Sequence, residues 1–299
     1  MENNYVIVVD STTDLPQNLA DEWGLVVVPY IFTLEGKDYH NYLDYRELSS
    51  KDFYGKLREG KSATTTQVTI FRYMEIWEPY LKEGKDILYM CLSSGLSKSY
   101  DQSVMAAQQA MEEYPGRKVI TIDTKSASLG QGMLAYLASK ARADGCSLEA
   151  AAEEIKDVIQ YLQIWFVPDD LFHLKRSGRV SGASALLGSV LSIKPVLSMV
   201  ADGRIVPIGK VRGWSKVFDY LLARMEEHNF KATEDPYGAL YIAHSDSPER
   251  AQQFREVAAA KFGIKDFRII DIGPVIGAHT GFGSLAISWV GNERININA

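Results

Sequence analysis

Cysteine is scarce in this sequence: only Cys91 and Cys146 occur among its 299 residues. Two cysteines cannot form a disulfide scaffold or a four-cysteine zinc site, and such sparse use is typical of a reducing compartment. Long apolar runs are also missing, because the segment nearest to one, 186–200, is interrupted by Lys194 and Pro195. The sequence therefore predicts no membrane-spanning helix, which needs about 18 apolar residues in succession.

Positively charged residues are also fewer than negatively charged ones. The 32 lysines and arginines stand against 38 aspartates and glutamates, a formal net charge of −6. An acidic chain is a poor general binder of nucleic acid, so no nucleic-acid partner is expected. Residues 1–4, MENN, carry an acid where a signal peptide needs basic residues, and we expect a cytoplasmic protein. The five histidines show no metal-ligand spacing, so no metal site is expected.

Short apolar stretches alternate with helical patterns along the whole chain. In the first half we expect strands at 5–9, 25–30, 86–92 and 118–123, and helices at 16–23, 45–57, 70–81, 96–111, 129–143 and 148–162. In the second half we expect strands at 164–167, 193–200, 204–208, 237–243 and 267–272, and helices at 169–175, 214–227 and 248–262. This alternation predicts an α/β fold with a parallel or mixed sheet. The length favours two domains, which we place at 1–162 and 163–299.

Two hydroxyl-rich segments are candidates for binding. Segment 92–97, LSSGLS, lies between a predicted strand and a predicted helix, where unpaired N–H groups and the helix dipole favour an anion. Four threonines between 64 and 69 are too many for one helix cap and would lie at the sheet edge where open α/β folds bind ligands. Helix capping by Ser93 or Ser94, and an ordinary polar loop at the threonines, are the alternative interpretations.

Basic residues and a glycine-flanked histidine add to this pattern. Between 173 and 216 there are eight basic residues and one acid, Asp202, which suggests an anionic ligand or an acidic partner surface. His279 lies in the segment GAHTGFG, where glycines allow close approach to a ligand. A solvated surface and a structural histidine are the alternatives. Segment 55–62, GKLREGKS, matches a phosphate-loop pattern, but it falls in a predicted helix and follows no strand, so no nucleotide site is expected there.

Seven short segments in this order resemble the DegV family of bacterial fatty-acid-binding proteins, and the resemblance covers nearly the whole chain. They are VDSTTDLP at 9–16, TTQ at 65–67, LSSGLSKSY at 92–100, DTK at 123–125, LKRSGR at 174–179, IKPVL at 193–197 and HTGFG at 279–283. The resemblance implies two α/β domains with a long-chain fatty acid in a tunnel between them.

Members of that family resemble the lipid-carrying subunit of bacterial fatty acid kinase. In that system a separate ATP-dependent kinase subunit phosphorylates the bound carboxylate, giving an acyl phosphate for phospholipid synthesis. The resemblance therefore implies a carrier that is not itself an enzyme, with a long-chain fatty acid as ligand, no cofactor, a kinase subunit as partner, and room for transient membrane contact.

The resemblance also assigns residues. It places the carboxylate at Thr65 and Ser94, and it implies roles for six more residues: Thr66 and Ser93 beside the carboxylate, Arg176 and His279 in a second layer, and Arg179 and Arg212 on the surface that faces the kinase. One departure concerns the threonine segment, which in the family usually continues Thr-Ser-Gln-Pro. Here Thr66 replaces the serine and Val68 the proline, which predicts a less rigid loop.

Two other interpretations stay open at this point. The first is a serine-dependent hydrolase or acyltransferase that uses Ser93 or Ser94 with His279, although no G-x-S-x-G elbow occurs. The second is a small-molecule phosphotransferase that acts with the basic loop. For a fatty-acid carrier the tail would contact apolar side chains, for which we expect Ile164, Phe166, Leu186, Leu187, Val190 and Leu191.

Overall fold

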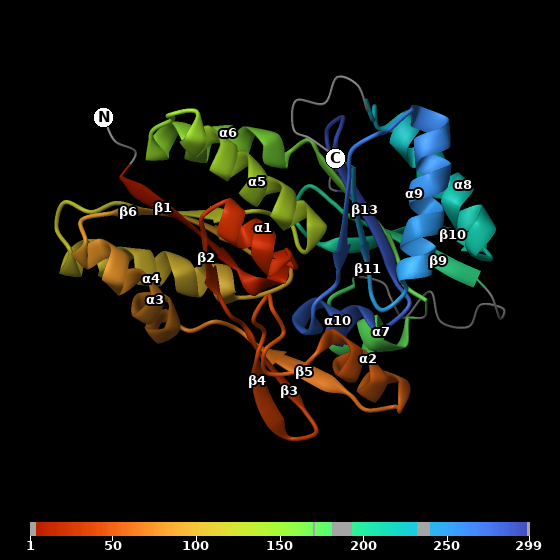
Figure 1. The fold of residues 1–299 in the computed structure, drawn as a ribbon, viewed down its shortest axis with the longest axis horizontal. Helices are drawn as coiled ribbons and strands as arrows, with labels where there is room; N and C mark the ends of the chain where they lie inside the picture. The colour runs from red at the N-terminus through yellow and green to blue at the C-terminus, as the bar shows by residue number, and fades with distance from the viewer. Residues whose placement is uncertain (1–3, 170, 181–192, 232–239, 298–299) are drawn as a thin grey trace.

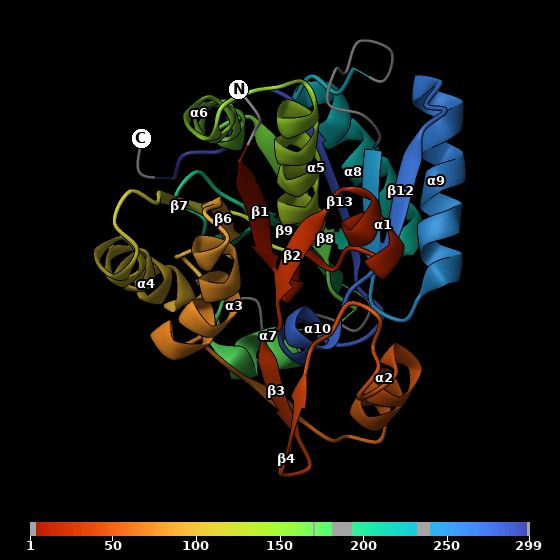
Figure 2. The same ribbon diagram turned by 60° about the vertical axis from the view of Figure 1, so that its left-hand side comes forward.

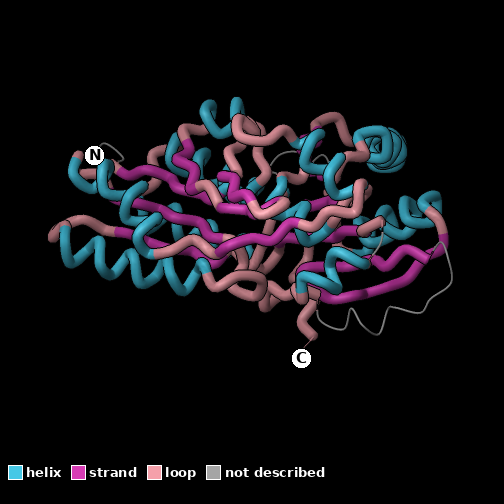
Figure 3. Tube along the Cα trace, turned by 90° about the horizontal axis from the view of Figure 1, so that it is seen from below, coloured by secondary structure: helices cyan, strands magenta, loops and turns pink. Residues whose placement is uncertain are grey.

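The structure is a computed structural model that describes residues 4–169, 171–180, 193–231 and 240–297. Its strands form three sheets of four, six and three strands (Figure 1). Viewed from below, helices lie on both sides of the strands (Figure 3). The α/β prediction is confirmed.

The four-stranded sheet is entirely parallel. Its order is β2 (Leu25–Val28), β1 (Tyr5–Asp10), β6 (Asp86–Cys91) and β7 (Val119–Asp123). Strands β1 and β6 are almost fully buried, as near-continuous apolar runs in parallel sheets are. One face is covered by α3 (Ile70–Lys82) and α4 (Ser99–Glu113), the other by α5 (Leu129–Ala143) and α6 (Leu148–Ile159), as Figure 1 shows. The short α1 (Gln17–Glu22) precedes β2.

The six-stranded sheet belongs to the second half of the chain. Its strands are β8 (Leu162–Val167), β9 (Ile193–Met199), β10 (Ile205–Arg212), β11 (Leu240–His244), β12 (Phe267–Asp271) and β13 (Leu285–Val290), in the order β10-β9-β8-β13-β11-β12. Only the β11–β12 pair is parallel. Both faces are buried, one under α8 (Trp214–Glu227) and α9 (Pro248–Phe262), the other against α5.

Strand β8 shows how the two halves share a core. Trp165 and Val167 face the cluster under α8 and α9, whereas Ile164 and Phe166 join the cluster that continues into the first half. Side chains of a strand alternate between faces, so one fully buried strand serves two cores. Ile164 and Phe166 are thus core residues, and the described lining of the main cavity does not include them. The other four residues expected at the tail lie outside the described residues.

The three-stranded sheet projects from the rest of the fold (Figures 1 and 2). It is antiparallel, in the order β4 (Lys37–His40), β3 (Ile31–Leu34) and β5 (Ala63–Thr66), and is accompanied by α2 (Ser50–Arg58). Two elements of the second half, α7 (Phe172–Ser177) and α10 (Pro274–Thr280), lie beside it, and α10 packs on β3, β5 and α2. The small sheet therefore brings the first half into contact with the end of the second.

Several sequence-based boundaries were wrong. The threonine segment is strand β5 and not a loop of the main sheet, and helix α2 begins at Ser50, capped by Ser49, because Tyr45 has a left-handed backbone with φ 54°. Helix α4 begins at Ser99, so the serine segment forms a separate turn before it. Strand β13 and helix α10 were not predicted at all. The strands expected at 193–200 and 204–208 pair as a hairpin around Ala201-Asp202-Gly203, and the second strand continues to Arg212.

The division of the chain after residue 162 stays a prediction. The strands of the four-stranded sheet all precede it, and β8 begins at Leu162 itself. Within the described ranges, no helix combines the length and the apolar character needed to cross a membrane.

Candidate functional site

A cavity of about 510 Å³ lies where the small sheet, α7, α10 and the turn after β6 converge. Its volume falls within the range of about 300–1,000 Å³ that is usual for small-molecule sites. The lining combines polar and apolar side chains, with the polar ones at Tyr30, Thr65, Thr66, Gln67, Ser94, Ser97, Lys98, Arg179, His279 and Thr280, and the apolar ones at Leu92, Leu96, Ala127, Leu174, Ile205, Val275 and Ile276. Such a site suits a ligand with one polar end and an apolar body.

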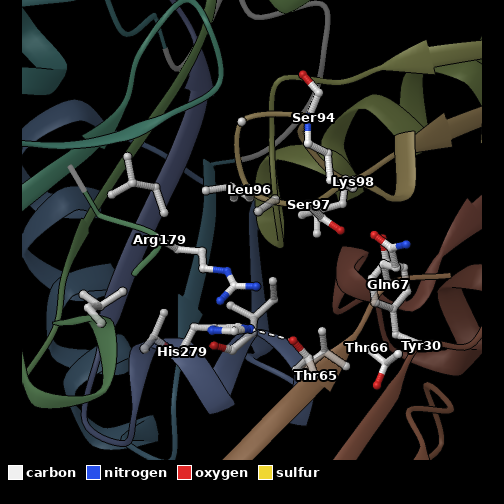
Figure 4. Close-up of a pocket in the computed structure, with 18 residues that line it drawn as sticks. Tyr30, Thr65, Thr66, Gln67, Ser94, Leu96, Ser97, Lys98, Arg179 and His279 are labelled. Atoms are coloured by element: carbon white, nitrogen blue, oxygen red, sulfur yellow. Dashed lines mark hydrogen bonds between the residues drawn. The ribbon is translucent and has the colours of Figure 1, made fainter. Parts of the chain in front are cut away.

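Thr65 and His279 meet in this cavity although 214 residues separate them. Thr65 lies on β5 with its side chain half-buried, while Thr64 before it is exposed on the other face of the strand. His279 lies in the last turn of α10 and not in a glycine loop, and its Nε2 is 2.9 Å from Thr65 Oγ1 (Figure 4). The structure thus joins a hydroxyl and an imidazole from opposite ends of the chain.

The imidazole of His279 is held neutral. Burial lowers its pKa from 6.5 to about 4, and the guanidinium groups of Arg179 and Arg176 lower it further in the same direction. Its Nδ1 is buried and has no hydrogen-bond partner among the described residues. A neutral ring keeps one nitrogen as donor and the other as acceptor, so His279 can hold the Thr65 hydroxyl in a defined direction.

The two arginines of segment 174–179 are both exposed, and they differ in their relation to the cavity. Arg179 lines the cavity, and Figure 4 shows its side chain reaching toward His279. Arg176 is exposed on α7, stacks over the Phe172 ring at 5.5 Å, and is not among the described residues of the cavity wall. The left-handed Gly178 ends α7 between the two arginines.

Ser94 lines the same cavity from the turn between β6 and α4. Its Oγ accepts a hydrogen bond from Lys125 Nζ at 2.9 Å, and its backbone N–H donates to Asp123 Oδ1 at 3.1 Å. Lys125 also forms an ion pair with Asp123 at 2.6 Å. Figure 4 shows the Ser94 hydroxyl at the opposite end of the view from Thr65 and His279. Sequence reasoning missed Lys125 as a partner, although it noted the DTK segment at the end of β7.

Ser93 has a structural position. It is fully buried, its hydroxyl donates to the Gly203 carbonyl at 2.8 Å, and it accepts from the Gly95 N–H at 3.1 Å. A Cβ on Gly203 would lie 2.1 Å from Ser93 Oγ, so this contact requires glycine. The expected position of Ser93 beside a ligand is therefore corrected: it joins the turn after β6 to the β9–β10 hairpin and does not line the described cavity.

The substitution at residue 68 has a compensating contact. Val68 is buried, and its backbone N–H donates to Ser99 Oγ at 3.0 Å. Proline, the residue usual for the resemblance, has no N–H and could not make this bond. The sequence predicts a less rigid loop, but in the structure this hydrogen bond ties the loop to α4. Thr66, two residues before Val68, lines the cavity with an exposed side chain.

Two remaining candidates lie away from the main cavity. Arg212 is exposed at the end of β10, beside a smaller hollow of about 220 Å³ lined by Ile193, Lys210 and Val211. The phosphate-loop pattern at 55–62 begins inside α2 and follows no strand, as expected. Within the described part of the chain, no three His, Cys, Asp or Glu side chains gather as a metal site would require.

The geometry does not form the serine–histidine pair of the hydrolase interpretation. In the described hydrogen bonds His279 pairs with Thr65, while the hydroxyls of Ser93 and Ser94 pair with Gly203 and Lys125. A nucleophilic serine needs a base within hydrogen-bond reach, and an ammonium group that already pairs with Asp123 is a donor only.

Comparisons with known proteins agree on one family. A family model described as "uncharacterised protein, DegV family" matches residues 4–292. A DegV domain-containing protein of Clostridium perfringens is 37% identical over 290 residues, which cover 97% of this chain and 98% of that protein.

Solved structures match over the same length. The structure of a DegV family protein from Thermus thermophilus, described by its fatty acid binding, aligns with a TM-score of 0.84 and 30% identity over 96% of this chain and 99% of that one. The structure of DegV from Bacillus subtilis, described as a fatty acid binding protein, aligns with a TM-score of 0.82 and 28% identity over 97% and 99%.

Proposed function

Because this chain belongs to the DegV family, we propose that it binds a long-chain fatty acid in the cavity between Thr65, Ser94 and His279 and presents the carboxylate to a separate ATP-dependent kinase. The observation that carries the proposal is the Thr65–His279 pair at the wall of a cavity that also offers apolar side chains for a tail. The fatty-acid binding described for the Thermus thermophilus and Bacillus subtilis relatives supports the choice of ligand.

The head group would lie at Thr65. With the proton of the neutral imidazole on Nε2, His279 donates to Thr65 Oγ1, and the threonine hydroxyl hydrogen is free to donate to a carboxylate oxygen. Arg179 adds positive charge on the same side. Ser94 lies at the other end of the cavity, where its hydroxyl, already paired with Lys125, offers a second polar position. Because the Thr65 hydroxyl is a single neutral donor, it leaves the second carboxylate oxygen available for phosphoryl transfer.

The tail would lie along the apolar part of the wall. Burial of each methylene is worth about 0.8 kcal/mol, so ten would contribute roughly 8 kcal/mol before ordering costs. A carboxylate buried without donors would cancel that gain. The site therefore needs both parts of its lining: Leu92, Ala127 and Ile205 are among the apolar groups available, and the hydroxyls supply the donors.

The kinase is part of the proposal because the described lining of this cavity includes no nucleotide-binding loop. Arg212 is exposed and outside the cavity, where it could contact an acidic partner surface, whereas Arg179 lies at the cavity itself and could contact both ligand and partner. We propose that the chain lies in the cytoplasm, where such a kinase works, and that the isolated chain forms no acyl phosphate from ATP.

Native mass spectrometry of the purified protein tests the binding step. We expect a co-purified mass that corresponds to a long-chain fatty acid, and uptake of added palmitate after delipidation. A cavity that rejects palmitate, oleate and stearate at micromolar concentrations would contradict fatty-acid binding.

Phosphorylation assays test the presentation step. With ATP and a fatty acid kinase subunit, the loaded protein should yield acyl phosphate, and Arg212→Ala should lower that rate while palmitate affinity stays unchanged. Acyl phosphate formed by the isolated chain would instead favour a phosphotransferase.

A further inference from the structure

Helix α10 is held to the first half of the chain at three points. At its end, His279 contacts Thr65. At its start, the Gly273 N–H donates to Asp14 Oδ1 at 3.0 Å. One residue earlier, the Ile272 carbonyl accepts from Tyr54 Oη at 2.6 Å. A helix of seven residues is too short to be stable by itself, so these contacts decide where it lies.

Asp14 lies close before α1 but does not cap it. It is 3% exposed and follows the 3-10 turn η1 (Ser11–Thr13) in a left-handed conformation with φ 55°. That backbone turns its carboxyl group away from α1 and toward Gly273, 259 residues further on. The first N–H groups of a helix have no partner within it, and Gly273 at the N-cap has no side chain to supply one. Asp14 supplies the acceptor from the other half of the chain.

The fit between the two residues is tight. A Cβ added at Gly273 would lie 2.8 Å from Asp14 Oδ1, closer than real contacts allow. The next residue, Pro274, has no N–H, so the Gly273 N–H is the one that holds the start of α10. His279 lies six residues later, within roughly 10 Å along the helix axis. A displacement at Gly273 therefore reaches the imidazole.

We propose that Asp14 is a positioning residue of the ligand site: by accepting the Gly273 N–H it sets the place of α10 and so holds His279 against Thr65. The expected change in palmitate affinity rests on the proposed function, whereas the coupling between Asp14 and His279 does not. It explains why an acid is buried where Asp10, Asp271, Tyr45 and Tyr54 surround it and no described cation pairs with it.

The protonation state agrees with this role. Burial raises the pKa of Asp14 to about 8, with the hydrogen bond from the Gly273 N–H opposing the rise and Asp10 and Asp271 adding to it. At neutral pH the group is therefore mostly a carboxylic acid, whose carbonyl oxygen still accepts the Gly273 N–H. Asparagine has the same shape and the same acceptor, which makes Asp14→Asn the matched conservative variant.

The test compares Asp14→Asn with Asp14→Ala in the full-length, delipidated protein. Palmitate affinity is measured together with the titration midpoint of the His279 imidazole by NMR. We expect Asp14→Asn to bind within about twofold of the wild type and Asp14→Ala to bind at least about tenfold more weakly. The His279 midpoint should stay near 4 in Asp14→Asn and rise toward 6.5 in Asp14→Ala, as the ring loses its burial.

Gly273→Ala gives a second approach in case Asp14→Ala does not fold. In an otherwise wild-type protein, the added methyl group should displace Asp14 and weaken palmitate binding. In the double variant with Asp14→Ala, the carboxyl group is already absent, so Gly273→Ala should weaken binding little further. A folded Asp14→Ala or Gly273→Ala protein with wild-type palmitate affinity and an unchanged His279 midpoint would overturn the proposal. If the wild type binds no palmitate, the proposed function fails, while the His279 midpoint still reports on Asp14.

Discussion

The two ends of the cavity use the same group in different ways. Thr65 and Ser94 each have a hydroxyl oxygen 2.9 Å from a side-chain nitrogen. The partner of Thr65 is a neutral, buried imidazole from the far end of the chain, whereas the partner of Ser94 is an ammonium group on the adjacent strand end, paired with Asp123. The first pair depends on assembly of the whole molecule, and the second is built within one sheet. We therefore expect the Thr65 end to be the more sensitive one.

The largest expected effect is on the pH dependence of stability. The folded-state pKa of His279 is about 4 and its ordinary value is 6.5, so the unfolded chain binds a proton first as the pH falls. Above pH 6.5 the ring is neutral in both states and does not lower the free energy of unfolding. As the pH falls from 6.5 to about 4, the free energy of unfolding decreases by roughly 3 kcal/mol because only the unfolded chain takes up the proton. Urea unfolding between pH 7 and 4 should show this slope in the wild type but not in His279→Gln. An equal slope in both proteins would mean that His279 is not buried as described.

The next effect concerns the head group at Thr65. Thr65→Val keeps the shape of the side chain and removes the hydroxyl, which should weaken palmitate binding by about 1–3 kcal/mol because a buried acceptor loses a donor. Thr64→Val is the matched control, since Thr64 lies on the same strand with its side chain exposed on the other face. Isothermal titration of both delipidated variants makes the comparison. Equal affinities for the two would remove Thr65 from the site.

A smaller effect is expected at the other end of the cavity. Ser94→Ala should weaken palmitate binding by about 1 kcal/mol, because Lys125 keeps its ion pair with Asp123 and the turn keeps its backbone contact. The same variant should leave the pH slope assigned to His279 unchanged. If Ser94→Ala proves more damaging than Thr65→Val, the order of the two ends is reversed and the ammonium-linked hydroxyl holds the carboxylate.

The smallest effect is expected at Val68. Val68→Pro loses the hydrogen bond to Ser99, worth about 0.5–1.5 kcal/mol, and gains about 0.4–1 kcal/mol from a stiffer unfolded chain. The free energy of unfolding should change by less than about 1 kcal/mol. Val68→Ala, which keeps the N–H, is the control for lost packing. A tenfold loss of palmitate affinity in Val68→Pro alone would show that the Val68–Ser99 bond shapes the cavity.

The sequence was informative about residue types and less so about placement. It identified Thr65, Ser94 and His279, which all line one cavity. It assigned Arg179 to the partner-facing surface alone, whereas this exposed residue also lines the cavity, and which surface Arg176 and Arg179 serve stays a prediction. It also placed Ser93 at the ligand, whereas that hydroxyl binds Gly203, a contact between segments 110 residues apart. No local pattern could have indicated such a partner.

By itself the sequence determined the α/β class and the buried strands β1, β6 and β8, since apolar runs act within a few neighbouring positions. Only the tertiary structure decided that Thr65 meets His279 and that Asp14 holds the start of α10. Those contacts join groups more than 200 residues apart, and their geometry depends on how whole sheets and helices pack together.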